Sequence, residues 1–258
     1  MAKKWVKFPY ADKAFVHDAA SLKKHWTRLH KGDCEPYPKD AAVVDAWRHY
    51  HAGDFQAAVE AGVAAGAAGA NAAVKAQVVY ANYLEKAAPA KLSLFEEAAG
   101  WADQRRGAAP KDANAHYLYA FALGRYSQGI SVAKALAQGF GGKIKDALTT
   151  AQKLEPKHAE AWTAFGAYQA EVIAKVGGIV AGMTYGAKKE SAQDCYQKAL
   201  KLFPESPIAH IEYGNGLMLL FGKSKIDEAT KVYEKAAACK PADAMERLDV
   251  ELAKSELE

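Results

Sequence analysis

One spacing of small, bulky and proline residues recurs along the second half of the chain. The pattern Ala-x3-Tyr-x2-Ala-x4-Pro covers residues 192–204 and again 229–241. A variant that begins with isoleucine and leucine covers residues 144–156, and a degenerate copy covers residues 98–110. Positions i, i+4 and i+7 lie on one face of a helix, and a proline ends the helix that precedes it. The spacing therefore predicts four helices that pack through the same kind of face.

A second signature precedes three of these helices. Leu123-Gly124, Phe165-Gly166 and Tyr213-Gly214 each place a large residue beside a glycine in the middle of a predicted helix. A glycine inside a helix costs about 1 kcal/mol relative to alanine. We therefore expect each of these glycines to allow close approach of a neighbouring helix.

Together these signatures resemble the tetratricopeptide repeat (TPR), a helix-turn-helix unit of about 34 residues. The resemblance covers residues 112–241 and extends more weakly over residues 40–110. Abundant alanine and few β-branched residues also favour helices over strands. The resemblance implies an all-α, TPR-like right-handed α-solenoid in which helix A and helix B of each repeat alternate.

The repeats leave a segment at each end of the chain. We expect residues 1–40 to form an N-terminal docking segment and a capping helix from about Asp18 to His30. Residues 41–241 then form about five TPR-like repeats, and residues 242–258 form a C-terminal capping helix. Terminal repeats need such caps because they would otherwise expose apolar faces.

Two central repeats carry inserts between helix A and helix B. Gly214 and Ala229 are 15 positions apart, whereas the equivalent distances are 20 from Gly124 to Ile144 and 26 from Gly166 to Ala192. Both inserts are apolar and rich in glycine, and we expect extended helices in these two repeats.

The larger insert reads "KVGGIVAGMTYGAKK", and its glycines have three interpretations. A phosphate loop would need GxxxxGK[ST] after a strand, which this stretch lacks. A membrane-inserting segment would be longer and would contain fewer lysines, although a peripheral contact remains open. The favoured interpretation is that Gly178, Gly182 and Gly186 let helices approach closely.

A narrower resemblance rests on "IKDALTTAQKLEPKHAEAWTAFGAYQAEV" and on "SAQDCYQKALKLFPESPIAHIEYGNGL", which lie on either side of the larger insert. These runs resemble the regulator of microtubule dynamics family and the bacterial TPR proteins associated with TRAP transporters. The resemblance implies a non-enzymatic binding protein, and in some members a hydrophobic or lipid-like ligand inside the solenoid.

Binding residues are expected on the concave face, which helix A of each repeat lines, and in the inserts. The main hypothesis is a scaffold that recognises a protein or peptide in this groove. The alternative is a carrier of a hydrophobic small molecule in an enclosed cavity near Ile179, Met183, Ile130 and Leu136. The groove could equally hold the chain's own terminal segments. The candidate residues are Leu118, Phe121, Arg125, Thr163, Ile208, Ile211, Asn215 and Met218 in the groove, and Ile179 and Met183 in the inserts.

Composition argues against several other classes of protein. A net charge of +4 with mixed acidic and basic residues does not indicate a nucleic-acid partner. Cys34, Cys195 and Cys239 are scattered, which is typical of reduced thiols and predicts a cytoplasmic protein. We expect neither a secretory signal nor an integral membrane segment.

The sequence contains no recognisable catalytic or metal-binding pattern. Its eight histidines match no closed zinc motif, and no catalytic triad can be inferred from scattered residues. We expect no enzymatic activity, no metal and no cofactor. The oligomeric state is left open.

Overall fold

The computed structural model describes residues 5–258, and every regular element in that range is a helix. The chain divides into two compact units. Unit 1 comprises residues up to His30 together with residues 35–131 and 242–245. Unit 2 comprises residues 31–34, 132–241 and 246–258. The expected all-α, TPR-like fold class is confirmed.

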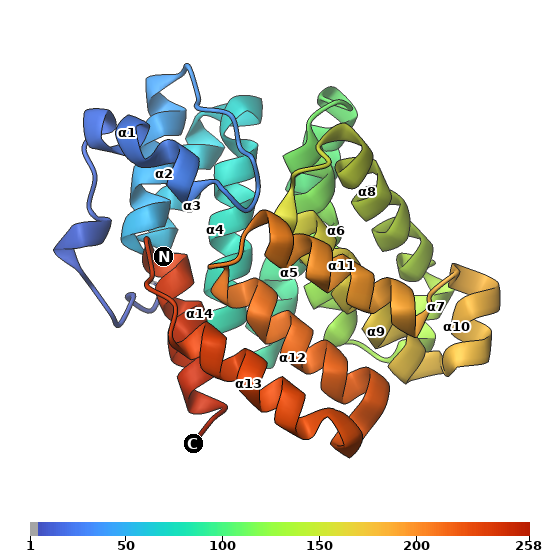
Figure 1. Ribbon diagram of the computed structural model, residues 1–258. Helices are drawn as coiled ribbons and strands as arrows, with labels where there is room; N and C mark the ends of the chain where they lie inside the picture. Colours follow the sequence, from blue (N-terminus) through green and yellow to red (C-terminus); the bar gives the residue numbers. More distant parts are fainter. Residues whose placement is uncertain (1–4) are drawn as a thin grey trace. The chain divides into compact units, whose positions relative to one another are not determined.

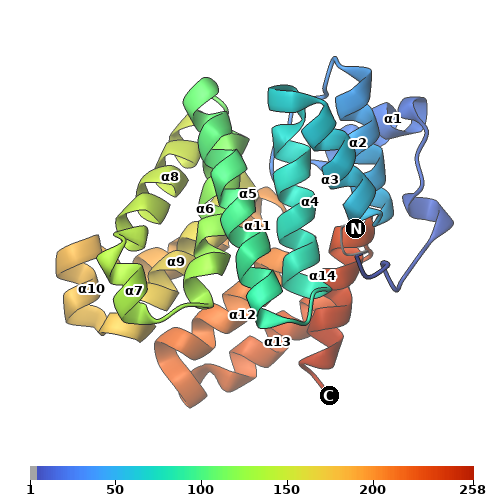
Figure 2. The same cartoon turned by 180° about the vertical axis from the view of Figure 1, so that it is seen from behind.

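Unit 1 is a series of helices in which each packs on the next along the chain. Contacts join α2 to α3, α3 to α4, α4 to α5 and α5 to α6 (Figures 1 and 2). The helices of this unit are α1 (Ala19–Leu29), α2 (Ala41–Ala52), α3 (Phe55–Ala64), α4 (Ala70–Tyr83), α5 (Ala88–Ala108) and α6 (Ala113–Gln128), with short 3-10 turns η1 (Lys13–Phe15) and η2 (Gly66–Gly69).

Unit 2 is built in the same way, with α9 packing on α8, α11 and α12 and with α12 packing on α13. Its boundary with unit 1 cuts the last helix after Met245. The helices are α7 (Val132–Ala137), α8 (Phe140–Leu154), α9 (Ala159–Val176), α10 (Gly178–Tyr185), α11 (Lys189–Leu202), α12 (Pro207–Phe221), α13 (Ile226–Ala237) and α14 (Ala244–Ser255), with a 3-10 turn η3 (Gly222–Lys225).

The recurring alanines and tyrosines lie where the pattern places them. Ala192, Tyr196 and Ala199 of α11 are all buried. A Cβ atom added at Gly166 of α9 would lie 2.9 Å from the Tyr196 ring, and one added at Gly214 of α12 would lie 2.6 Å from the Tyr233 ring. Close helix approach is therefore confirmed at these two glycines, because the rings occupy the space that a side chain would need.

Gly124 does not follow this rule. A Cβ atom added there would meet nothing within 4 Å, so the expected close approach is wrong at this position. The glycine lies in α6 without a neighbour that requires it.

Helices α2 and α4 take the helix-A positions in unit 1, and other segments of the same unit pack against them. Every residue from 71 to 81 of α4 is buried. On α2, Trp47 packs edge-to-face against Trp26 of α1 at a centroid separation of 6.0 Å. The hydroxyl of Tyr50 on the same helix donates to the Met245 sulfur at 2.8 Å. Segments from both ends of the chain therefore pack against α2.

The aromatic N-terminal segment also packs onto unit 1. The Trp5 ring stacks on Tyr80 of α4 at 3.9 Å, and the Val6 backbone N–H donates to the Tyr80 hydroxyl at 3.2 Å. The Phe8 ring packs edge-to-face on Phe55 of α3 at 6.3 Å. These contacts lie on α3 and α4.

The larger insert consists of the end of α9 followed by the separate short helix α10. Gly177 separates them with φ +81° and ψ 153°, and Gly186 ends α10 with φ +67°. Both φ values are positive, which favours glycine because it has no Cβ atom to clash. These two glycines therefore break and terminate helices.

Close helix approach at Gly178, Gly182 and Gly186, the favoured interpretation of their spacing, is wrong. A Cβ atom at Gly178 would meet nothing within 4 Å, and one at Gly182 would lie 3.9 Å from the Ala187 carbonyl oxygen. At Gly186 the nearest atom is Lys145 Nζ at 3.6 Å, an ordinary contact distance. The four-residue spacing is the same as that of helix-packing glycines, but here no neighbouring helix lies close enough to need it.

Candidate binding surfaces

Helix α12 carries a partly exposed stripe of mixed polarity in unit 2. Ile208 and Met218 are half-buried, whereas Asn215 and Leu219 are exposed, Leu219 by 43%. These positions follow helical spacing and so share one side of the helix. We call Ile208, Asn215, Met218 and Leu219 the α12 stripe.

The packing of α12 explains why the stripe is held in place. Ile211 lies on the same side of the helix, between Ile208 and Asn215, and is buried with Ala236 of α13 and Ala253 of α14. Leu217 is buried against Ala229 and Val232 of α13. The Tyr233 hydroxyl donates to Asn215 Oδ1 and orients that amide. The α12 stripe therefore combines apolar anchors with a fixed polar group.

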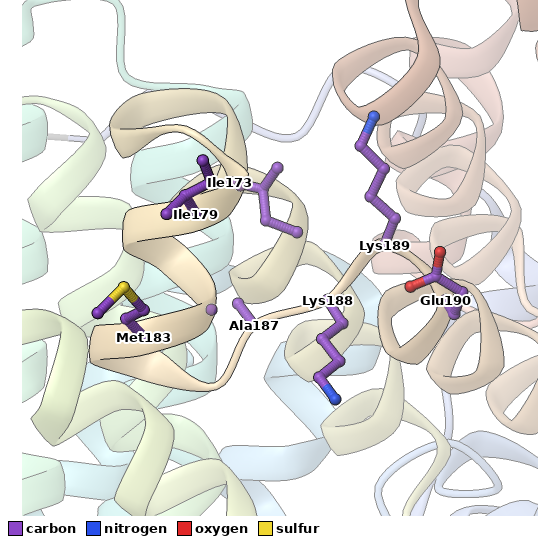
Figure 3. Close-up of a pocket in the computed structure, with 9 residues that line it drawn as sticks. Ile173, Ile179, Met183, Ala187, Lys188, Lys189 and Glu190 are labelled. Atoms are coloured by element: carbon purple, nitrogen blue, oxygen red, sulfur yellow. The ribbon is translucent and has the colours of Figure 1, made fainter.

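A second surface lies where α9, α10 and α11 meet. Here an open pocket of about 510 Å³ combines apolar side chains with a charged edge (Figure 3). Ile179 and Met183 project from α10, and Lys188 and Lys189 point in opposite directions at the start of α11. The complete lining is Ile173, Gly178, Ile179, Gly182, Met183, Ala187, Lys188, Lys189 and Glu190.

Two of the residues that line this pocket also belong to a buried hydrophobic cluster. Ile173 of α9, Ala187 and Tyr196 belong to one hydrophobic cluster, which also contains Leu220 of α12. The Lys189 ammonium donates to the Leu220 carbonyl oxygen at 2.6 Å and lies 5.0 Å from the Phe221 ring centroid. Lys188 and Lys189 are both exposed at the pocket edge, but Lys189 has these partners within unit 2.

The cavity expected near the inserts is not enclosed. Ile179 and Met183 line the pocket but are 81% and 85% exposed, and neither Ile130 nor Leu136 is part of the lining. The enclosed cavity is therefore a wrong expectation. The short helix α10 buries only Ala181, so its other apolar side chains remain at the surface.

The ten predicted binding residues fall into separate groups in the structure. Four share α12, and Ile211 among them is buried. Ile179 and Met183 share the insert pocket. Thr163 of α9 is buried, and its hydroxyl donates to the Ala159 carbonyl oxygen at 3.0 Å.

The remaining three lie on α6 of unit 1. Leu118 is buried, whereas Phe121 and Arg125 are half-buried. The Phe121 ring stacks on Tyr117 at 5.8 Å, and the Arg125 guanidinium lies 5.6 Å from the Phe121 ring centroid. The assignment of the ten residues to a binding site stays a prediction.

Sequence reasoning missed the pocket residues that come from flanking helices. Ile173, Lys188, Lys189 and Glu190 line the pocket without having been chosen from the sequence. The lysine pair directly after the last glycine of the insert was the available signal. Repeat spacing also places Leu219, next to the predicted Met218, on the face expected to line the groove, but spacing alone does not indicate which of the two neighbours is exposed.

A buried hydrogen-bonded chain in unit 1 also lacked any signal in the sequence. His51 Nδ1 lies 2.7 Å from Asp243 Oδ2, and His51 Nε2 lies 3.2 Å from His30 Nε2. Burial lowers the pKa of His51 although the hydrogen bond to Asp243 acts in the opposite direction. Nearby, the Glu35 carboxylate accepts from the amides of Asn114 at 2.7 Å and Asn71 at 3.2 Å.

The cysteines are poorly suited to nucleophilic chemistry. Burial raises the pKa of the Cys195 thiol to about 12, and it raises the pKa of the Cys34 thiol to about 11. With these pKa values both thiols are protonated near neutral pH. Because a nucleophilic cysteine reacts as its thiolate, both are weakly reactive.

The comparisons with known proteins agree with this architecture. The crystal structure of TTC0263, a thermophilic TPR protein in Thermus thermophilus, is similar to the chain with a TM-score of 0.57 and 15% sequence identity. The similarity covers 83% of this chain and 97% of that one. At this identity it shows the fold alone, which is that of a TPR protein. No curated protein matches the sequence.

A family model gives the narrower assignment. The model for regulator of microtubule dynamics protein 1-3 matches residues 71–258, and the chain belongs to this family. The family expected from the repeat and insert sequences is thereby confirmed. No helix between residues 5 and 258 has the length and apolar character needed to cross a bilayer.

Proposed function

We propose that the chain is a non-enzymatic scaffold that binds a protein or peptide through the helix-A surface of unit 2. The observation that carries this proposal is the α12 stripe. It keeps Asn215 and Leu219 exposed on a helix that is held in place by the buried side chains of Ile211 and Leu217. Pre-formed apolar anchors beside an oriented polar group are what a peptide-recognition surface needs.

The contrast with unit 1 supports the choice of unit 2. In unit 1, α4 is buried from residue 71 to residue 81, and segments from both ends of the chain pack against α2. A partner would have to displace these segments before it could reach that side. On α12, Leu219 needs no such displacement because it is already exposed.

The experiment that tests this proposal compares partner capture by two variants. Leu219→Asp places a charge in the α12 stripe, and Val63→Asp places one at a similarly exposed apolar position on α3. Partners captured from a lysate of the source cells by the wild-type chain are quantified by mass spectrometry. We expect Leu219→Asp to lose them about tenfold or more, as hot-spot substitutions do, and Val63→Asp to retain them. If both variants captured the partners equally well, the α12 stripe would not be the binding surface.

A second candidate function is that of a carrier for a hydrophobic small molecule. The insert pocket, with its apolar lining and its volume of about 510 Å³, favours it. Ligand pockets typically measure about 300–1,000 Å³. Solvent extraction of the purified chain followed by mass spectrometry tests this function, and the absence of any stoichiometric co-purifying lipid would argue against it.

Two further predictions from the sequence belong to the same proposal. The absence of enzymatic activity stays a prediction; the raised thiol pKa values of Cys34 and Cys195 argue only against a cysteine nucleophile. The cytoplasmic location stays a prediction based on cysteine usage. Neither metal nor cofactor is part of the proposed binding function.

A further inference from the structure

Two short helices of unit 2 present apolar side chains to solvent. Helix α7 buries none of its side chains, and α10 buries only Ala181. Both helices contact α8, and they lie side by side in both views of the molecule (Figures 1 and 2). We call their exposed apolar residues the insert surface: Val132 and Leu136 on α7, and Ile179, Val180 and Met183 on α10.

The exposure of the insert surface is unusual for residues of this kind. Ile179 and Met183 are 81% and 85% exposed, although a folded chain gains free energy by removing such side chains from water. Exposed apolar side chains gathered on neighbouring elements, rather than scattered singly, mark an interaction site.

Lysines predominate around the insert surface, although the exposed Glu190 of the same pocket and Asp146 of α8 adjoin it. Residues 127–145 and 172–189 contain six lysines and neither aspartate nor glutamate. Lys175 is paired with Glu171 of the preceding helical turn, with a separation of 3.2 Å between Lys175 Nζ and Glu171 Oε2. Lys143 and Lys188 are exposed near the ends of α8 and α10. Cationic side chains therefore flank the apolar ones.

We propose that the insert surface docks on an anionic lipid bilayer. Apolar side chains would enter the boundary between headgroups and acyl chains, while the lysines would contact the anionic headgroups. The binding would be peripheral, because no helix in residues 5–258 could span the bilayer. A protein partner fits this surface less well, because lysine is depleted at protein interfaces and enriched in helices that lie on membranes. The proposal goes beyond the peptide-binding function and does not depend on the α12 stripe.

Vesicle flotation tests the proposal directly. The purified full-length chain is mixed with phosphatidylcholine vesicles, or with vesicles that also contain about one third phosphatidylserine. We expect the chain to float with the anionic vesicles and to remain unbound with the neutral ones. Binding should weaken as NaCl is raised from about 0.1 to 0.5 M, because salt screens the attraction between lysines and headgroups. Equal binding to the two kinds of vesicle, or binding to neither, would overturn the proposal.

Matched variants then locate the surface. Ile179→Asp/Met183→Asp should weaken binding to anionic vesicles at least about tenfold, because apolar contacts are replaced by charges that the membrane repels. Both side chains are exposed, so this variant should fold, which circular dichroism verifies. The control Val63→Asp changes an exposed apolar residue on α3 and should bind like the wild type. Wild-type affinity of the α10 variant would contradict the proposal.

The charge contribution has its own pair of variants. Lys143→Glu/Lys188→Glu should also weaken binding at least about tenfold, since each lysine near an anionic surface contributes measurably to affinity. Lys24→Glu/Lys39→Glu changes the net charge equally at exposed positions of unit 1 and should have a smaller effect. If both charge variants lose binding to the same extent, net charge rather than the insert surface controls it, and the proposal fails.

Discussion

The ring of Tyr196 shows how single residues define the repeat contacts of unit 2. It is 1% exposed and packs against Gly166 of α9 and Gly216 of α12. A Cβ atom at Gly216 would lie 2.6 Å from the ring, closer than real side chains approach. The two glycines therefore offset their unfavourable helix propensity by allowing a buried tyrosine to pack between helices.

This packing predicts opposite effects for two glycine substitutions. Gly216→Ala should lower the free energy of unfolding by about 1–3 kcal/mol, because the buried Tyr196 ring has no room to move. Gly124→Ala is the control: its Cβ would meet nothing within 4 Å, so the substitution should raise stability by up to about 1 kcal/mol. Urea unfolding measures both values, and a stable Gly216→Ala variant would show that Tyr196 adjusts freely.

The buried histidine chain predicts loss of stability in acid. Burial lowers the pKa of His51, and burial also lowers the pKa values of His17 and His210. The unfolded chain therefore binds more protons than the folded one below the usual histidine pKa of about 6.5. The stabilisation is complete above that pH and is lost as the pH falls below it, by at most about 1.4 kcal/mol per pH unit for each histidine.

A substitution at His51 separates its contribution from the others. His51→Asn keeps a donor that can reach Asp243 and removes the titrating imidazole. Thermal unfolding between pH 7.5 and 5.5 should show a lower Tm at pH 7.5 and a shallower decline in acid than the wild type. A decline as steep as that of the wild type would show that His51 does not titrate in this range.

Among the elements, the inserts differ most from what their sequence suggested. The recurring alanine, tyrosine and proline positions predicted the repeat helices well, because every copy must make the same helix contact. The glycines of the larger insert have the spacing of helix-packing glycines. Gly177 instead separates α9 from α10, and Gly186 ends α10. Spacing alone could not distinguish these roles, since the difference depends on whether a neighbouring helix is present.

The break at Gly177 predicts a difference between two adjacent glycines. The backbone there has φ +81° and ψ 153°, a region that side chains rarely adopt. Gly177→Ala should therefore cost about 1–3 kcal/mol of stability. Gly178→Ala should be neutral or slightly stabilising, because its Cβ would meet nothing within 4 Å in a helical position. Urea unfolding of the two variants provides the comparison, and equal stabilities would contradict the proposed role of Gly177.

At the scale of the whole molecule, the two units differ in what covers their helix-A surfaces. In unit 1, contacts such as His51–Asp243 join residues 192 positions apart in the sequence. No periodicity could have revealed them, because they occur once and not in every repeat. The position of the α12 stripe was predictable, since Ile208, Asn215, Met218 and Leu219 follow repeat spacing, but spacing alone did not indicate which of them are exposed. The family assignment fits a binding scaffold without naming its partner.

Site-specific photo-crosslinking tests the central claim, that a partner binds at the α12 stripe, most directly. A photoreactive phenylalanine analogue replaces Asn215 in one variant and Val63 in another, both at exposed positions. We expect defined partner proteins to crosslink at position 215 and excess wild-type chain to compete them away, whereas position 63 should yield none of them. The same set of crosslinked proteins from both positions, or none at position 215, would contradict the account.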